Sequence, residues 1–95
     1  MNLTNRAVRY KEHGDPSSVL FLEELPVEKL GDREVRIEIV AASIHPSDIG
    51  LVQGSYGELK KLPAVAGREG VGKVIEIGCD VPKDVINKIV AVPDT

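Results

Sequence analysis

The residue in this sequence best suited to acid–base chemistry is Tyr56, which lies between glycines in the run Gly54-Ser-Tyr-Gly57. Glycines on both sides predict a tight, exposed bend, and a phenol presented on a turn can serve as a proton donor. Most tyrosines only fill space in a core or on a surface, so spacing alone leaves both interpretations of Tyr56 open.

The run His45-Pro-Ser-Asp48 has the residue types of a hydrolytic triad. A histidine three residues before an aspartate does not by itself form a chain of nucleophile, base and orienting group, and no oxyanion motif accompanies it. Pro46 suits the first position of a helix, and Ser47 and Asp48 suit its first turn. We therefore predict a short helix over residues 46–53 that ends at Gly54.

The glycine-rich run Gly67-Arg-Glu-Gly-Val-Gly72 differs from a dinucleotide-binding fingerprint. That fingerprint has the spacing GxGxxG between a strand and a helix, whereas the glycines here have the spacing GxxGxG. The β-branched residues Val74, Ile75 and Ile77 follow, which indicates a strand. We interpret the glycines as bends in that strand and predict no pyrophosphate site here.

Histidine and cysteine are too sparse to predict a metal site. His13, His45 and Cys79 are isolated, and no two of them have the spacing of zinc ligands. His13 lies in a turn-rich stretch and is expected to be exposed to solvent. A single cysteine is more often a small buried hydrophobic residue than a nucleophile, and we expect this of Cys79.

The composition describes a folded domain and excludes several classes of protein. The chain has 95 residues, of which 42% are hydrophobic and 28% charged, with a net charge of −3. The sequence lacks the stripe of basic residues that nucleic-acid binding needs. Its apolar runs are far shorter than the roughly 20 residues of a membrane helix. No signal peptide is evident, so we expect a soluble protein of the cytoplasm, or of an organelle matrix such as the mitochondrial matrix.

Strands must position these residues, because alternating and β-branched segments dominate the sequence. In residues 34–41, for example, Val35, Ile37 and Ile39 alternate with charged side chains, which is typical of a half-buried strand. The predicted strands are residues 6–10, 19–25, 34–41, 67–78 and 88–92, with a loop over residues 59–66. We predict a mainly β fold, a small and partly open β-barrel with one or two short helices.

Four segments of the sequence, taken in order, resemble the medium-chain dehydrogenase/reductase superfamily. They are Gly31-Asp-Arg-Glu-Val-Arg-Ile-Glu-Ile39, Ala41-Ala-Ser-Ile-His-Pro-Ser-Asp-Ile49, Gln53-Gly-Ser-Tyr-Gly57 and Leu62-Pro-Ala-Val-Ala-Gly-Arg-Glu-Gly-Val-Gly72. The resemblance implies that residues 1–95 form its N-terminal chaperonin-10-like catalytic domain. Within the superfamily the pattern is similar to the trans-2-enoyl thioester reductases of mitochondrial-type fatty acid synthesis, with quinone reductases as near neighbours.

The resemblance also implies roles for individual residues. Tyr56 corresponds to the tyrosine held to protonate the substrate carbon after hydride transfer. His45 stands where this subfamily usually has an asparagine beside the nicotinamide. Zinc-dependent members have a cysteine at the position of His45 and a histidine at that of Arg68, and only the accompanying Glu69 remains. An arginine does not ligate a divalent metal, so the resemblance implies a zinc-independent enzyme.

The implied cofactor is NADPH, and the implied substrate is an enoyl thioester or a quinone. The nucleotide-binding domain of the family is absent from residues 1–95, so we expect this chain alone to be inactive. The sequence neither predicts nor excludes that the protein forms a homodimer. A third alternative is a non-catalytic chaperonin-10-like binding module, which would need a mobile hydrophobic docking loop. Residues 59–63 are too basic and too short for that role.

Overall fold

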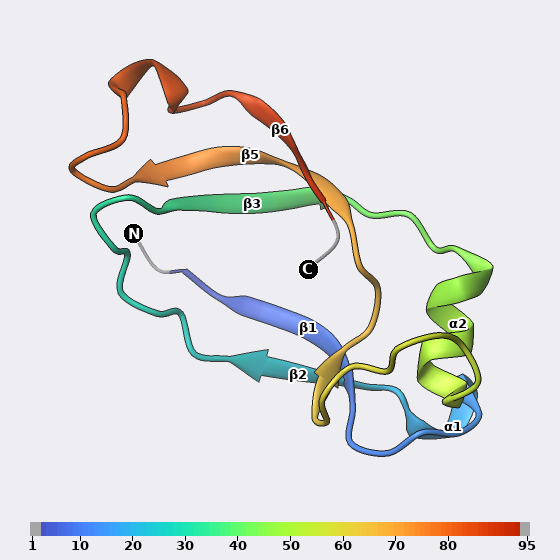
Figure 1. Cartoon of the computed structure of the whole chain (residues 1–95). Helices are drawn as coiled ribbons and strands as arrows, with labels where there is room; N and C mark the ends of the chain where they lie inside the picture. Colours follow the sequence, from blue (N-terminus) through green and yellow to red (C-terminus); the bar gives the residue numbers. More distant parts are fainter. Residues whose placement is uncertain (1–2, 94–95) are drawn as a thin grey trace. The chain divides into compact units, whose positions relative to one another are not determined.

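The computed structural model describes residues 3–93 and contains mainly β-structure (Figure 1). Within this range, six strands form two three-stranded sheets. The chain divides into two compact units. Unit 1 comprises the residues up to Val27 together with Ile44–Gly67, and unit 2 comprises Glu28–Ser43 together with the residues from Arg68 onward.

The sheet of unit 1 is built on the first strand of the chain. Strand β1 (Asn5–Tyr10) pairs antiparallel with β2 (Phe21–Leu25) on one side and with β4 (Ala64–Val65) on the other. The connection from β1 to β2 contains the single-turn helix α1 (Pro16–Val19). The Asp15 carboxylate begins this helix by accepting hydrogen bonds from the Ser17 backbone N–H and hydroxyl, at 3.0 and 2.9 Å.

The core of unit 1 joins this sheet to helix α2 (Pro46–Gln53). Tyr10 is completely buried and clusters with Val52 of α2 and Ala64 of β4. Partly buried apolar side chains pack around this cluster, and they are Val19, Leu20, Leu62 and Ala66. Because the core contacts α2 directly, burial of apolar area fixes the helix on its sheet.

Unit 2 is a sheet in the order β3-β5-β6, formed by β3 (Val35–Ala41), β5 (Gly70–Ile77) and β6 (Ile89–Val92) (Figure 1). A short 3-10 helix, η1 (Lys83–Val85), lies between β5 and β6. The ladder between β3 and β5 shifts register twice, and the second shift, between Ile39 and Ala41, lies beside Gly72 of β5. A methyl group on Gly72 would overlap the Glu38 carbonyl and the Ile37 side chain, so glycine here permits a close backbone approach.

The structure confirms the prediction of a mainly β chain with short helices, and neither sheet closes into a barrel within residues 3–93, in agreement with an open architecture. It also differs locally from the prediction. Residues 16–19 form a helical turn where we expected the reversal and the beginning of a strand. Strand β4 lies inside the expected loop, because Arg9 and Tyr10 of β1 provide a pairing partner distant in sequence. Among the described helices, none is long and apolar enough to cross a membrane.

Candidate functional site

Helix α2 positions both residues that the sequence singled out for chemistry, His45 and Tyr56. The helix begins as predicted, with Pro46 in its first turn. Asp48 is only 6% exposed, and its carboxylate accepts a 2.8 Å hydrogen bond from the His45 backbone N–H. In return the Asp48 N–H donates to the His45 carbonyl at 2.9 Å. Asp48 thus stabilises the start of the helix, which confirms its capping role.

His45 is the residue immediately before α2, and its side chain is exposed. Its backbone is extended, with φ −100° and ψ 155°. An exposed imidazole can donate or accept a hydrogen bond, depending on its tautomer. His45 thus presents an exposed side chain at the start of α2.

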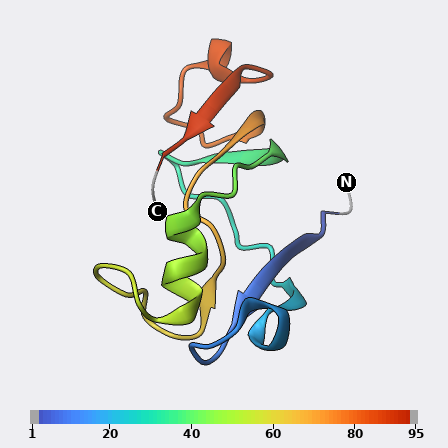
Figure 2. The same cartoon turned by 90° about the vertical axis from the view of Figure 1, so that its right-hand side faces the viewer.

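Tyr56 follows the end of α2, and half of its surface is exposed. Gly54 ends the helix in the left-handed conformation with φ 85°, where glycine is favoured because it has no Cβ. The Ser55 N–H then donates to the Gly50 carbonyl at 3.0 Å, which turns the chain back along the helix. Figure 2 shows the segment after α2 as a loop beside the helix that returns to β4. The predicted exposed bend at Tyr56 is confirmed.

His45 and Tyr56 lie in one unit, His45 directly before α2 and Tyr56 after its end. The turn at Gly54 brings the Tyr56 side chain back along the helix, so Tyr56 lies beside Gly50 in the middle of α2 and not at the end opposite His45.

Unit 2 contains an open cleft that sequence reasoning missed. Its volume is about 590 Å³, and its walls are mostly alanine, valine, glycine and proline, with two polar residues, Ser43 and Glu69. The Ser43 hydroxyl donates a 3.3 Å hydrogen bond to a Glu69 carboxylate oxygen. Glu69 directly precedes β5 and Ser43 follows β3, so the pairing of these strands brings the two together. Two signals in the sequence could have predicted this contact. They are the alternating pattern of residues 34–41 and the glycine-rich run of residues 67–72, which indicate two strands that can pair.

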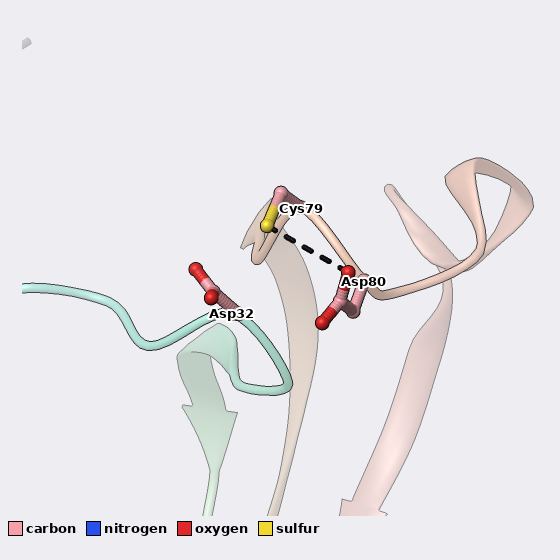
Figure 3. Close-up of side chains that lie close together, drawn as sticks. All are labelled: Asp32, Cys79 and Asp80. Carbon is pink, nitrogen blue, oxygen red and sulfur yellow. Dashed lines mark hydrogen bonds between the residues drawn. The ribbon is translucent and has the colours of Figure 1, made fainter.

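Three groups with metal-ligand chemistry also meet in unit 2, at the turns that flank the β3–β5 pair (Figure 3). The Asp32 and Asp80 carboxylates and the Cys79 thiol lie within 4.8 Å of one another, and all three side chains are exposed. Hydrogen bonding to Asp32 raises the pKa of the Cys79 thiol, with burial as the second cause. A raised pKa favours the neutral thiol, whereas a metal binds the thiolate, so a metal ion at this position would have to displace the thiol proton.

Two expectations from the sequence are wrong. Cys79 is exposed rather than buried, because it lies in the turn after β5 and not in the sheet. His13 is half-buried rather than exposed. The Gly14 N–H donates to the Val52 carbonyl at 3.0 Å, which holds this turn against the end of α2, where the His13 side chain covers Gly54.

The fold and these residues define a mainly β domain, and comparison with known proteins identifies its family. The model of the alcohol dehydrogenase GroES-like domain matches residues 31–94. The chain belongs to this family, within the medium-chain dehydrogenase/reductases that the sequence resembles.

Several known proteins are similar to this chain. The mitochondrial enoyl-[acyl-carrier-protein] reductase of Xenopus tropicalis is 49% identical over 77 residues, which cover 81% of this chain and 22% of that protein. Etr1p in complex with NADP and crotonyl-CoA is 28% identical with a TM-score of 0.81, over 95% of this chain and 28% of that one. Etr1p is a mitochondrial 2-enoyl thioester reductase of Candida tropicalis, solved also as a heterodimer with Etr2p.

A quinone oxidoreductase of Coxiella burnetii is 30% identical with a TM-score of 0.77, over 94% of this chain and 29% of that one. This chain therefore spans between a fifth and a third of the length of these relatives. The relatives include both enzyme types that the sequence resembles.

Proposed function

We propose that this chain is the substrate-binding, catalytic-domain portion of a zinc-independent, NADPH-dependent 2-enoyl thioester reductase of fatty acid synthesis. The observation that carries the proposal is the exposed Tyr56 phenol on a turn fixed by α2. The identity to enoyl-[acyl-carrier-protein] reductases supports the substrate class. The names of those relatives support a location in mitochondria, and the Candida tropicalis heterodimer supports a dimeric enzyme.

In the proposed reaction, one hydride and one proton are added across the double bond of the enoyl thioester. When bound, NADPH supplies the hydride that the β-carbon accepts. The Tyr56 hydroxyl donates its proton to the α-carbon, and the phenolate then takes a proton from water. A general acid held in position typically contributes about 10²- to 10⁴-fold to such a reaction.

Only part of the cofactor fits the residues described here. His45 is exposed and offers a hydrogen bond that suits the carboxamide of a nicotinamide. The glycine-rich segment runs directly into β5 rather than into a helix, so it does not fit a pyrophosphate. We therefore expect the phosphates to be bound by a separate nucleotide-binding domain, and this chain alone to be inactive.

A zinc ion does not fit the position of Arg68. A guanidinium stays protonated and has no lone pair to offer a divalent metal. We expect the purified chain to contain no stoichiometric zinc, which elemental analysis of protein prepared without chelator measures. One equivalent of zinc that is lost in Cys79→Ser would instead assign a metal to the thiol and its two neighbouring carboxylates.

The test of the function uses a chimeric reductase, in which this chain replaces the matching segment of the Xenopus tropicalis enzyme. Tyr56→Phe removes the hydroxyl and keeps the ring. With an enoyl thioester and NADPH, kcat should fall by about 10²- to 10⁴-fold with a modest change in KM. A kcat within about threefold of the unmodified chimera would contradict the role of Tyr56.

A second candidate function is quinone reduction, which the similarity to the Coxiella burnetii enzyme favours. A quinone reductase of this fold would not depend on a proton-donating tyrosine. The same two chimeras, assayed with a quinone and NADPH, separate the candidates. Rapid quinone reduction that is equal in both, without enoyl thioester reduction, would select this second function.

A further inference from the structure

The middle of helix α2 contains a glycine that the helix itself does not require. Gly50 is the fifth of eight helical residues, and its φ does not lie in the left-handed region that favours glycine. Glycine inside a helix is less favourable than alanine, because it loses more conformational entropy on folding. A reason for glycine at this position must come from its surroundings.

The nearest neighbour of Gly50 is the Tyr56 side chain, at its Cβ and Cγ atoms. A Cβ atom on Gly50 would lie 2.7 Å from the Tyr56 Cβ and 3.5 Å from its Cγ. Non-bonded carbons at optimal separation are about 3.5–4.0 Å apart. Rotation of the tyrosine about its Cα–Cβ bond does not move Cβ, so only a backbone shift would relieve the overlap.

The backbone of Gly50 holds the same turn from the other side. Its carbonyl accepts hydrogen bonds from the N–H groups of Gly54 and Ser55, each at 3.0 Å. Gly50 therefore fixes the position of Tyr56 in two ways. Its carbonyl accepts the hydrogen bonds of the turn, and its lack of a side chain leaves room for the Tyr56 Cβ. We call this packing of Tyr56 against Gly50 the seating of Tyr56. Half of the tyrosine surface remains exposed, while its Cβ atom lies against the helix.

We propose that Gly50 is a positioning residue for the Tyr56 phenol. It lets the tyrosine lie against α2 and so fixes the direction in which the hydroxyl is presented to the substrate carbon. This inference rests on the proposed function only for the role of the phenol. The seating itself can be measured without any enzymatic activity.

The first test measures this seating by NMR on the 95-residue chain. The chain has two tyrosines, Tyr56 and the buried Tyr10, so ring signals from labelled tyrosine are readily assigned. We expect a nuclear Overhauser effect between the Gly50 Hα and Tyr56 Hβ protons in the unmodified chain. Its absence would overturn the proposal, whether or not any variant folds.

Substitution sharpens this test. Gly50→Ala should shift the Tyr56 ring signals and leave those of Tyr10 in place, whereas Gln53→Ala, on an exposed position of the same helix, should shift neither. Tyr56→Gly removes the obstructing Cβ, so adding Gly50→Ala to it should raise Tm through the higher helix propensity of alanine. Beside Tyr56, the same substitution should lower Tm. Effects of the same sign in both backgrounds would overturn the proposal.

The chimeric reductase tests the consequence for catalysis. Because a misplacement of 1 Å can cost about 10²-fold in rate, Gly50→Ala should lower kcat by about 10- to 100-fold and change KM little. The same substitution in the Tyr56→Phe background should cause almost no further loss. A normal kcat in Gly50→Ala would overturn the positioning role. Harmless Tyr56→Phe would instead overturn the proposed function, while the NMR result on seating would stand.

Discussion

Unit 1 and unit 2 each contain a three-stranded antiparallel sheet, but different interactions hold them together. In unit 1 the completely buried Tyr10 ring is the centre of a cluster that joins sheet and helix. In the described part of unit 2, Val74 is the only apolar side chain that is buried, at 1% exposure, while Ile39, Val40 and Ile89 are exposed. Unit 1 thus depends on a side-chain core, and unit 2 depends more on its backbone ladders.

Close backbone approach at glycine is a feature of unit 2 and not of the sheet of unit 1. In unit 2 the glycines allow backbone segments to approach closely, as where Gly78 lies against the carbonyls of Gly31 and Asp32. The sheet of unit 1 has no such glycine, and its ladder from Asn5↔Leu25 to Arg9↔Phe21 has no register shift. The candidate proton donor therefore lies in the unit with the side-chain core, which suits a group that must keep its position.

The largest expected effect is the loss of the Tyr10 ring. Tyr10→Ala should lower the free energy of unfolding by about 3–5 kcal/mol, as large-to-small substitutions of buried aromatics do. Val74→Ala should cost less, about 1.5–3 kcal/mol, because less apolar area is lost. Urea denaturation followed by circular dichroism measures both, and an equal or larger effect at Val74 would contradict the comparison.

Hydrogen exchange shows where the Tyr10→Ala effect falls. Amides of β1 and α2 should exchange faster by a larger factor than amides of the β3–β5 ladder. Equal acceleration throughout residues 3–93 would show that the two units do not differ in their dependence on the Tyr10 core.

The second prediction concerns the backbone contacts of unit 2. Gly78→Ala should lower the free energy of unfolding by about 1–3 kcal/mol, because its methyl group would overlap two backbone carbonyls that cannot rotate away. Asp80→Ala, two residues further along the chain at an exposed position, should stay within about 0.5 kcal/mol of the unmodified chain. A neutral Gly78→Ala would mean that unit 2 does not depend on close backbone packing.

Local signals in the sequence were sufficient where a structure depends on neighbouring residues. Pro46 and Gly54 mark the two ends of α2 correctly, because a helix start and a left-handed helix end each need particular residue types. Asn87 adopts φ 69° before β6, a conformation that asparagine tolerates. The alternation of residues 34–41 likewise gives β3 almost to its ends.

Contacts between distant segments could not be predicted in the same way. Strand β4 has two residues and exists because β1 offers it a partner some 55 positions earlier in the chain. Two further contacts depend on how the chain folds back, and the residue types alone do not predict them. They are the hydrogen bond between Ser43 and Glu69 and the packing of Tyr56 against Gly50. Tyr56 was therefore identifiable as a candidate, while the features that position it were not.

The third prediction tests a polar atom inside the core of unit 1. The Tyr10 hydroxyl is buried and makes no hydrogen bond within the described residues. A buried hydroxyl without a partner costs free energy, so Tyr10→Phe should raise the free energy of unfolding by about 1 kcal/mol at pH 7. A loss of similar size would reveal a partner for the hydroxyl.

The same variant carries a pH dependence. Burial raises the pKa of Tyr10 above its usual value of 10.0, because the charged form would lose its hydration. The neutral hydroxyl is therefore favoured in the folded state, and the unmodified chain should lose stability relative to Tyr10→Phe as the pH rises above about 10. Urea denaturation at pH 7 and at about pH 10.5 measures the difference, and a constant difference would contradict the burial of this group.

The smallest expected effect concerns the turn of unit 1 that begins α1. Hydrogen bonds from Ser17, first from its hydroxyl and then from its backbone N–H, lower the pKa of Asp15 below its usual value of 3.8. Because the folded state favours the carboxylate, Asp15 stabilises the chain at neutral pH, and this contribution is lost as the pH falls below about 4 through the lowered pKa. Asp15→Ala should therefore lower Tm slightly at pH 7 and leave it unchanged near pH 2, whereas Glu12→Ala, an exposed neighbour, should have little effect at either pH. If Asp15→Ala lowered Tm equally at both pH values, the carboxylate would not be the group that begins α1. Tyr10 would then be the only side chain supporting the conclusion that unit 1 depends more on side-chain interactions than unit 2 does.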